Sequence, residues 1–154
     1  MAYNASVYRE QGGAKQVIDN GGTLEIRTGG AFSVISPLVK IGYSTGAGLA
    51  VTQATNRTTG VTINAVSGTI TTNNASLGPE LSAKFTVTNS AVAIGDVILL
   101  SQQSGAVGVM TTVEVVAVAA GSFDIAVMNG NAAGGVAETG AILINFIVLK
   151  AVSA

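Results

Sequence analysis

Short segments in which apolar and hydroxyl-bearing residues alternate are the most constraining feature of this chain. They recur through its second half, separated by turns with glycine or asparagine at intervals of roughly 8–12 residues. The segment at 109–118 is rich in valine and threonine, whose β-branched side chains favour strands over helices. No segment shows the spacing of a long amphipathic helix. The pattern therefore predicts an all-β protein, built as an antiparallel β-sandwich or jelly-roll-like domain.

The predicted sandwich domain covers residues 61–154, and its turn residues divide it into strands. A hairpin is expected first, in which 61–66 and 69–72 pair about a turn at Ser67-Gly68. The other expected strands are 85–88, 96–101, 109–118, 123–128 and 141–150. The last of these is so rich in Ile, Leu and Val that burial on both faces is predicted.

The first 35 residues form a different kind of segment, which is predicted to be extended. A short repeat stands at 21–26 and 29–34, each copy opening on Gly-Gly and continuing with alternating apolar residues. This repeat predicts two short strands joined by a tight turn. Two copies are too few to build their own core, so the ribbon either packs against another chain or forms a plain hairpin at the domain edge. Residues 36–60, with Pro37 and several Gly, Thr and Asn, are interpreted as a linker.

The residue types that are missing remove whole classes of chemistry. There is no His and no Cys, which excludes a Ser-His-Asp relay, a zinc triad, a thiol nucleophile and a disulfide framework. The eight Asp and Glu residues are scattered, and a glycosidase pair assembled by the fold is the remaining catalytic alternative. Asp124 alternates with Phe123 and Ile125 and is expected to face solvent. We therefore expect no enzyme, no cofactor and no metal site.

Charge and hydropathy also limit the partners. Only 10% of the residues are charged and the net charge is −1, so the chain has no field to attract nucleic acid. The apolar run at 141–149 is interrupted by Asn145 and is too short to cross a bilayer as a helix. Asn145 could pair with its own copy at an oligomer axis, or be satisfied by a neighbouring backbone group. Neither nucleic acid nor a membrane is expected as a partner.

Several strings of the sequence resemble those of one family. Residues 8–13 (Tyr-Arg-Glu-Gln-Gly-Gly) and 22–26 (Gly-Thr-Leu-Glu-Ile) resemble the N-terminal segment of tailed-bacteriophage virion proteins of the capsid decoration, cement or head-fibre type. The body is similar to the same group at residues 51–53, 56–62, 85–92, 118–125, 144–146 and Lys150. The resemblance covers most of the chain. It implies a β-sandwich that assembles as a homotrimer on the outside of a phage head, with no catalytic residues. The resemblance also implies that residues 1–35 are the segment that anchors the protein to the shell.

The expected function that follows is a capsid decoration protein that bridges subunits of the major capsid protein and stabilises the shell. Tyr and Arg are enriched at protein interfaces, and the candidate anchors are Tyr3, Tyr8, Arg9, Lys15 and Arg27, with Leu24, Ile26, Phe32 and Val34 packing the repeat. The alternative is a head or tail fibre component that binds the host surface. Met1 is followed by no apolar signal segment, so we expect synthesis in the host cytoplasm and a final place on the capsid exterior.

Overall fold

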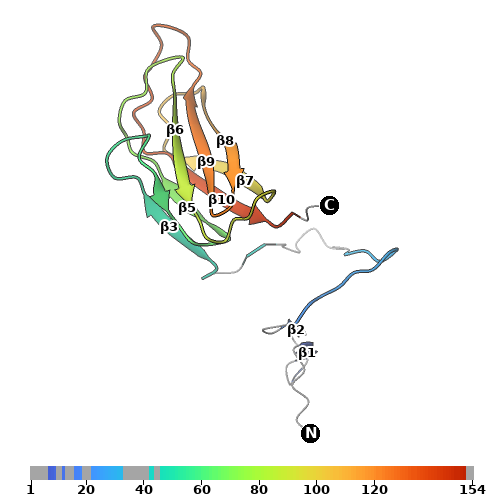
Figure 1. The fold of residues 1–154 in the computed structure, drawn as a ribbon. Helices are drawn as coiled ribbons and strands as arrows, with labels where there is room; N and C mark the ends of the chain where they lie inside the picture. The colour runs from blue at the N-terminus through green and yellow to red at the C-terminus, as the bar shows by residue number, and fades with distance from the viewer. Residues whose placement is uncertain are drawn as a thin grey trace. The chain divides into compact units, whose positions relative to one another are not determined.

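The computed structural model describes residues 7–9, 12, 16–18, 22–32, 42–43 and 46–151. The chain divides into two compact units, Met1–Ile41 and Gly42–Ala154 (Figure 1). None of the described residues belongs to a helix long and apolar enough to cross a membrane.

The N-terminal unit contains a small antiparallel pair of strands. β1 (Val7–Arg9) pairs with β2 (Gln16–Ile18). Residues 22–32 form no strand, so the two strands predicted from the repeat are wrong over this stretch. The turn between the copies is present: the Gly30 N–H donates to the Arg27 carbonyl at 2.8 Å. An isolated two-stranded ribbon is only marginally stable in water, and here the alternating apolar side chains gain no burial that would hold a ladder together.

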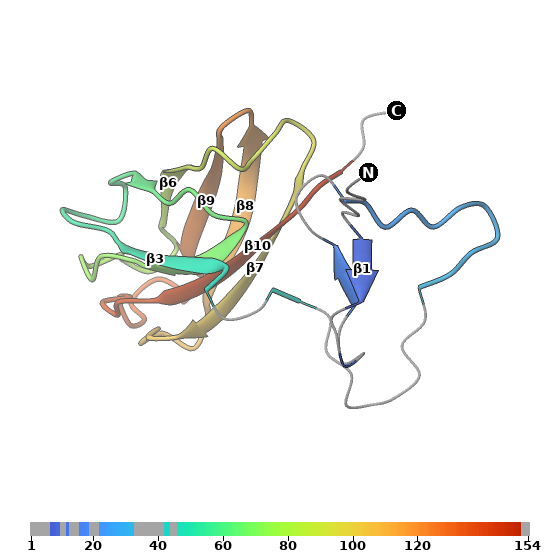
Figure 2. The ribbon, with the colours of Figure 1, turned by 90° about the horizontal axis from the view of Figure 1, so that it is seen from below.

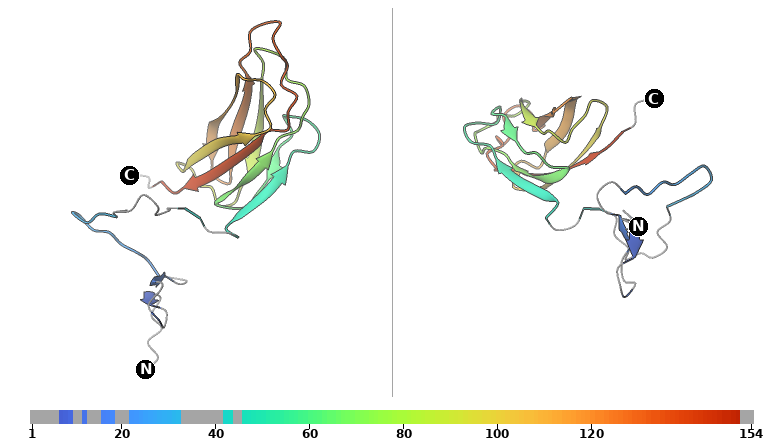
Figure 3. Two further views of the ribbon diagram at one scale, coloured as in Figure 1. Left: turned by 180° about the vertical axis from the view of Figure 1, so that it is seen from behind. Right: turned by 60° about the horizontal axis from the view of Figure 1, so that its bottom comes forward.

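The second unit consists of two four-stranded sheets packed face to face, which Figure 2 shows as two layers. We call the first sheet I; its strands, in spatial order, are β3 (Gly48–Thr52), β5 (Ser67–Thr71), β10 (Leu143–Leu149) and β7 (Val97–Ser104). We call the second sheet II; its strands, in spatial order, are β4 (Val61–Thr62), β6 (Ser82–Thr88), β9 (Ser122–Asn129) and β8 (Thr111–Ala119). In Figure 3, left, β10 in red lies between green β5 and yellow β7.

The predicted all-β, sandwich-like class is confirmed, and the five later strands form close to their expected places. Each sheet is mixed rather than purely antiparallel, because β3 pairs with β5 in parallel and β4 pairs with β6 in parallel. The parallel pairs arise because successive strands from β3 to β6 alternate between the two sheets. Parallel neighbours require such a crossover, whereas antiparallel ones can be joined by a tight turn, as β8 and β9 are.

The predicted hairpin at 61–72 is wrong. Its two halves lie in different sheets, since β4 belongs to sheet II and β5 to sheet I. Gly68 lies inside β5 and not in a turn. A Cβ on Gly68 would lie 2.9 Å from the Ile63 side chain and 3.0 Å from the Phe146 ring, so this glycine is required by close packing.

The core fills the space between the two sheets. Phe123 of β9 and Phe146 of β10 meet there, with ring centroids 5.6 Å apart and planes tilted by 50°. The buried core residues are Val61, Ile63, Ile70, Leu77, Ala83, Phe85, Val87, Val92, Ile98, Phe123, Ile125, Val127, Ile142, Ile144, Phe146 and Val148. Strand β10 is buried on one face only: Ile144, Phe146 and Val148 point inward, whereas Ile147 and Leu149 are exposed. Its predicted burial on both faces is therefore wrong, because nothing in the described sandwich covers the outer side of sheet I.

The segment interpreted as a linker contributes to the sandwich. β3 lies within residues 36–60, and so do two buried polar side chains, Gln53 and Arg57. Gln53 donates to the carbonyls of Arg57 and Thr59 at 3.1 and 2.8 Å, and its own carbonyl accepts from the Asn73 N–H at 3.0 Å. These bonds hold the threonine-rich loop at 54–60 in place with polar contacts, which a hydropathy pattern does not reveal.

Candidate interaction surfaces

The outer faces of the two sheets differ in charge. None of the residues in the four strands of sheet I is charged, whereas sheet II carries Lys84, Glu114 and Asp124. On sheet II, Lys84 Nζ lies 2.6 Å from Asp124 Oδ2, and the Thr86 hydroxyl donates to Asp124 Oδ1 at 2.7 Å. Sheet II thus carries charged side chains, and sheet I carries none.

The uncharged face of sheet I carries an apolar ridge along β7 and β10. We define the ridge as Val97, Leu99 and Leu149, which are 48%, 51% and 46% exposed. Leu149 lies opposite Val97 in the pairing of the two strands, and Leu99 lies opposite Ile147. Contiguous exposed apolar residues of this kind typically mark interaction sites, whereas scattered ones do not.

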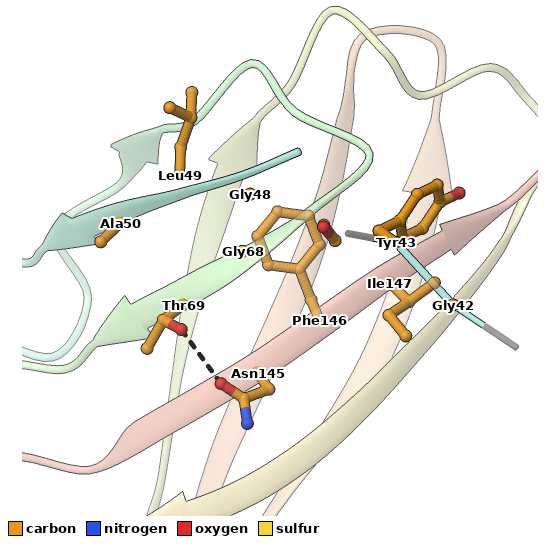
Figure 4. Close-up of a pocket in the computed structure, with 11 residues that line it drawn as sticks. Gly42, Tyr43, Gly48, Leu49, Ala50, Gly68, Thr69, Asn145, Phe146 and Ile147 are labelled. Carbon is orange, nitrogen blue, oxygen red and sulfur yellow. Dashed lines mark hydrogen bonds between the residues drawn. The ribbon is translucent and has the colours of Figure 1, made fainter. Parts of the chain in front are cut away.

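A shallow hollow of about 720 Å³ lies beside the ridge (Figure 4). Its lining includes small residues of β3 and β5, namely Gly48, Ala50, Ser67 and Thr69. Larger side chains border it, among them Ile147 and Tyr43. The hollow therefore results from small residues next to large ones on neighbouring strands.

Two polar contacts fix the border of the hollow. The Tyr43 hydroxyl donates to the Val148 carbonyl at 3.2 Å, which places the start of the second unit along the end of β10. The Thr69 hydroxyl donates to Asn145 Oδ1 at 3.0 Å. Asn145 is thus hydrogen-bonded to a side chain on the adjacent strand. The sequence had suggested a backbone group or a second copy of Asn145 as its partner.

The residues predicted as anchors lie in the N-terminal unit, and the structure describes part of them. Tyr8 and Arg9 belong to β1. Arg27 pairs with Glu25 at 3.2 Å on the surface. Leu24, Ile26 and Phe32 are 64%, 47% and 64% exposed, so in the described residues they do not form the packed repeat that was expected. Tyr3, Lys15 and Val34 lie outside the described residues.

A buried carboxylate that sequence reasoning missed organises one end of the sandwich. Glu138 has no exposed surface. Its oxygens accept from the N–H groups of Val107, Gly108 and Gly140 at 3.0, 3.0 and 2.7 Å and from the Thr111 hydroxyl. Burial by itself raises the pKa of Glu138, but these hydrogen bonds outweigh it and the pKa is lowered.

Arg57 is the cationic partner of this carboxylate, with Nη2 at 4.0 Å from Glu138 Oε1. Its guanidinium also donates to the carbonyls of Glu138 and Gly140 at 3.1 and 2.9 Å, and to that of Ala75 at 2.5 Å. Every buried side-chain nitrogen and oxygen in the described part of the chain has a hydrogen-bond partner. The pair is closed to solvent and saturated by protein groups, so it joins loops together and offers no group to a substrate.

Partners also lower the pKa values of two other carboxylates of the sandwich. Hydrogen bonds from Lys150 and from the Ala93 N–H lower the pKa of Asp96, whose side chain is buried. Hydrogen bonds from Lys84 and Thr86 lower the pKa of Asp124. Asp124 was expected to face solvent; its side chain is on the outer side of sheet II but only 17% exposed.

These shifts predict a loss of stability in acid. A carboxylate with a lower pKa in the folded state stabilises the fold above its unfolded pKa, and that contribution is lost as the pH falls through the folded pKa. We expect the free energy of unfolding to be constant near neutrality and to fall below the ordinary values of 3.8 for Asp and 4.5 for Glu. Urea unfolding at a series of pH values from about 7 to about 2 measures this free energy of unfolding. The Asp96→Asn variant should show a shallower fall, and an equally steep one would contradict the assignment.

Among the described residues, no group of three or more His, Cys, Asp or Glu is placed to hold a metal ion. Comparisons with models of known protein families, with curated proteins and with solved structures gave no match. The uncharged outer face of sheet I and the N-terminal unit both carry exposed apolar side chains, and these are the candidate functional surfaces.

Proposed function

We propose that this chain is a structural protein of a phage virion that decorates the outside of the head, as a homotrimer, and bridges subunits of the major capsid protein. The resemblance of residues 8–13, 56–62 and 118–125 to decoration and head-fibre proteins suggests the setting. The observation that carries the proposal is the uncharged, partly apolar outer face of sheet I. A surface of this kind can be buried without the cost of several kcal/mol for desolvating each ion.

The mechanism is passive. A protein that binds only the assembled shell shifts the assembly equilibrium toward the shell by mass action. Each square ångström of apolar surface removed from water contributes about 25 cal/mol. In this proposal the N-terminal unit contacts the shell through Tyr8, Arg9 and Arg27 and through its exposed apolar side chains, and the sandwich provides the contacts between copies.

The N-terminal contact predicts a loss of head binding in a surface variant. Leu24 and Phe32 are each 64% exposed, so the double variant Leu24→Glu/Phe32→Glu should fold normally. We expect its affinity for purified heads to fall at least about tenfold, equivalent to about 1.4 kcal/mol of binding free energy. Co-sedimentation of the purified chain with heads measures it. Unchanged binding would contradict the role of the N-terminal unit.

Electron cryomicroscopy of the virion tests the function itself. The proposal expects many copies on the outer surface of the head, and a variant without residues 1–34 that stays trimeric but no longer binds. If no copy lies on the head, the proposal is wrong. Few copies at a fibre position, together with binding to host cells, would instead support the head or tail fibre alternative.

A further inference from the structure

We infer that copies of this chain associate through the outer face of sheet I, with the ridge of one copy seated in the hollow of the next. This inference rests on the proposed function, which supplies the number of copies in the assembly, and it deepens that function. It names the surface of self-association, which lies in the sandwich and not in the N-terminal unit.

Charge favours a second copy as the occupant of this face. A foreign partner is commonly selected by charges complementary to those of the surface it meets. A second copy carries the same charges as the first, so juxtaposed patches of one sign repel. The strands of sheet I have no charge at all, and the charged residues next to the ridge in sequence, Asp96 and Lys150, neutralise each other in a direct pair. Sheet II, with Lys84, Glu114 and Asp124, lacks this property.

Shape gives the arrangement a direction. The hollow lies over the small residues of β3 and β5, and the ridge lies on β7 and the end of β10, at the other side of the same face. Because the projection and the depression lie at different places on one surface, the projection of one copy fits the depression of the next, and the copies associate head to tail. Such heterologous contacts generate a closed ring when the rotation closes.

Asn145 supplies a directional group in the middle of this uncharged face. Its Oδ1 accepts from Thr69, and Figure 4 shows its amide nitrogen pointing away from that hydroxyl. Within the part of the chain described, this nitrogen donates no side-chain hydrogen bond. A single polar group in an apolar interface can set the register of association, and the Asn145 amide is placed to do so.

Light scattering of the full chain tests the surface. The wild type should have a multiple of the 15.2 kDa chain mass. Leu99→Glu, on the ridge, and Ala50→Phe, in the hollow, should each reduce the mass to that of one chain at the same concentration. Met128→Glu is the matched control, because Met128 is 43% exposed on sheet II and its variant should keep the wild-type mass. Circular dichroism and thermal unfolding establish that all three variants are folded.

Mixing the two ridge and hollow variants tests the head-to-tail geometry. The Leu99→Glu chain keeps an intact hollow and the Ala50→Phe chain keeps an intact ridge, so an equimolar mixture should form a hybrid pair of twice the 15.2 kDa chain mass. A mixture that stays at the mass of single chains would overturn the ridge-in-hollow arrangement.

Three other results would overturn the surface itself: a wild type with the mass of one chain, a Leu99→Glu variant with the wild-type mass, or dissociation by Leu24→Glu/Phe32→Glu alone. These failures are distinguishable from failure of the proposed function. A single-chain wild type that binds heads refutes the self-association surface and the trimer but leaves the decoration of the head standing. An oligomer that does not bind heads refutes the decoration of the head and leaves the self-association surface standing.

Discussion

Replacing Glu138 by glutamine is expected to lower the free energy of unfolding by about 3–5 kcal/mol, the range for breaking a buried ion pair. Glutamine has nearly the same shape, but its amide nitrogen is a donor where the carboxylate oxygens accept from the backbone N–H groups of Val107, Gly108 and Gly140. The substitution also leaves Arg57 buried without its counter-ion. Urea unfolding monitored by circular dichroism measures the loss.

The matched control is Glu114→Gln, which removes the same charge from an exposed position on β8. Its expected effect is within about 0.5 kcal/mol of zero, because surface substitutions away from special contacts are nearly neutral. Equal stability of the Glu138→Gln variant and the wild type would refute the structural role of the buried pair.

Truncation of Phe146 to alanine is expected to cost about 3–5 kcal/mol, through lost burial and the cavity left behind. The ring is 1% exposed, packs against Phe123 and lies against the backbone of Gly68. The cavity would therefore open in the centre of the sandwich, between β5 of sheet I and β9 of sheet II. Thermal unfolding and urea unfolding should both report the loss.

Phe32→Ala provides the comparison, because it deletes the same side chain from a position that is 64% exposed. We expect its unfolding free energy to differ from the wild type by less than about 0.5 kcal/mol. A comparable loss in both variants would mean that Phe32 is buried in solution. The affinity for heads should show the opposite order: Phe32→Ala should weaken head binding more than Phe146→Ala, since Phe32 belongs to the proposed contact with the shell.

Local patterns were sufficient to predict the class of the fold and most of its strands. The segments around Phe85, Val113 and Ile125 each became a strand. Burial alternates strictly in β6, whereas the alternation is interrupted in β8 by a bulge and in β9 at Ala126. The pairing of strands was beyond such reasoning. Ser67-Gly68 has the composition of a turn, yet the sequence from Val61 to Thr71 crosses from one sheet to the other. Gly68 is needed because three other segments, at Leu49, Ile63 and Phe146, approach its backbone.

The charged residues show the same limit. Arg57 sits in a polar loop and Glu138 in a glycine-rich one, 81 residues apart, and neither shows any periodicity that predicts burial. Their carboxylate, guanidinium and backbone partners come together only when the loops converge at one end of the sandwich. Likewise, the composition shows at once that the chain has few charged residues. That one sheet has no charged residue at all follows only from the order of the strands.

The amino-acid sequence alone determined that this is an all-β protein without histidine or thiol chemistry, because strand periodicity and residue composition are local properties. The tertiary structure alone decided which strands share a sheet, which charges are buried and which face is free of charge. The physical reason is that strand pairing, burial and surface potential depend on contacts between residues far apart in the chain, which no short window of sequence contains.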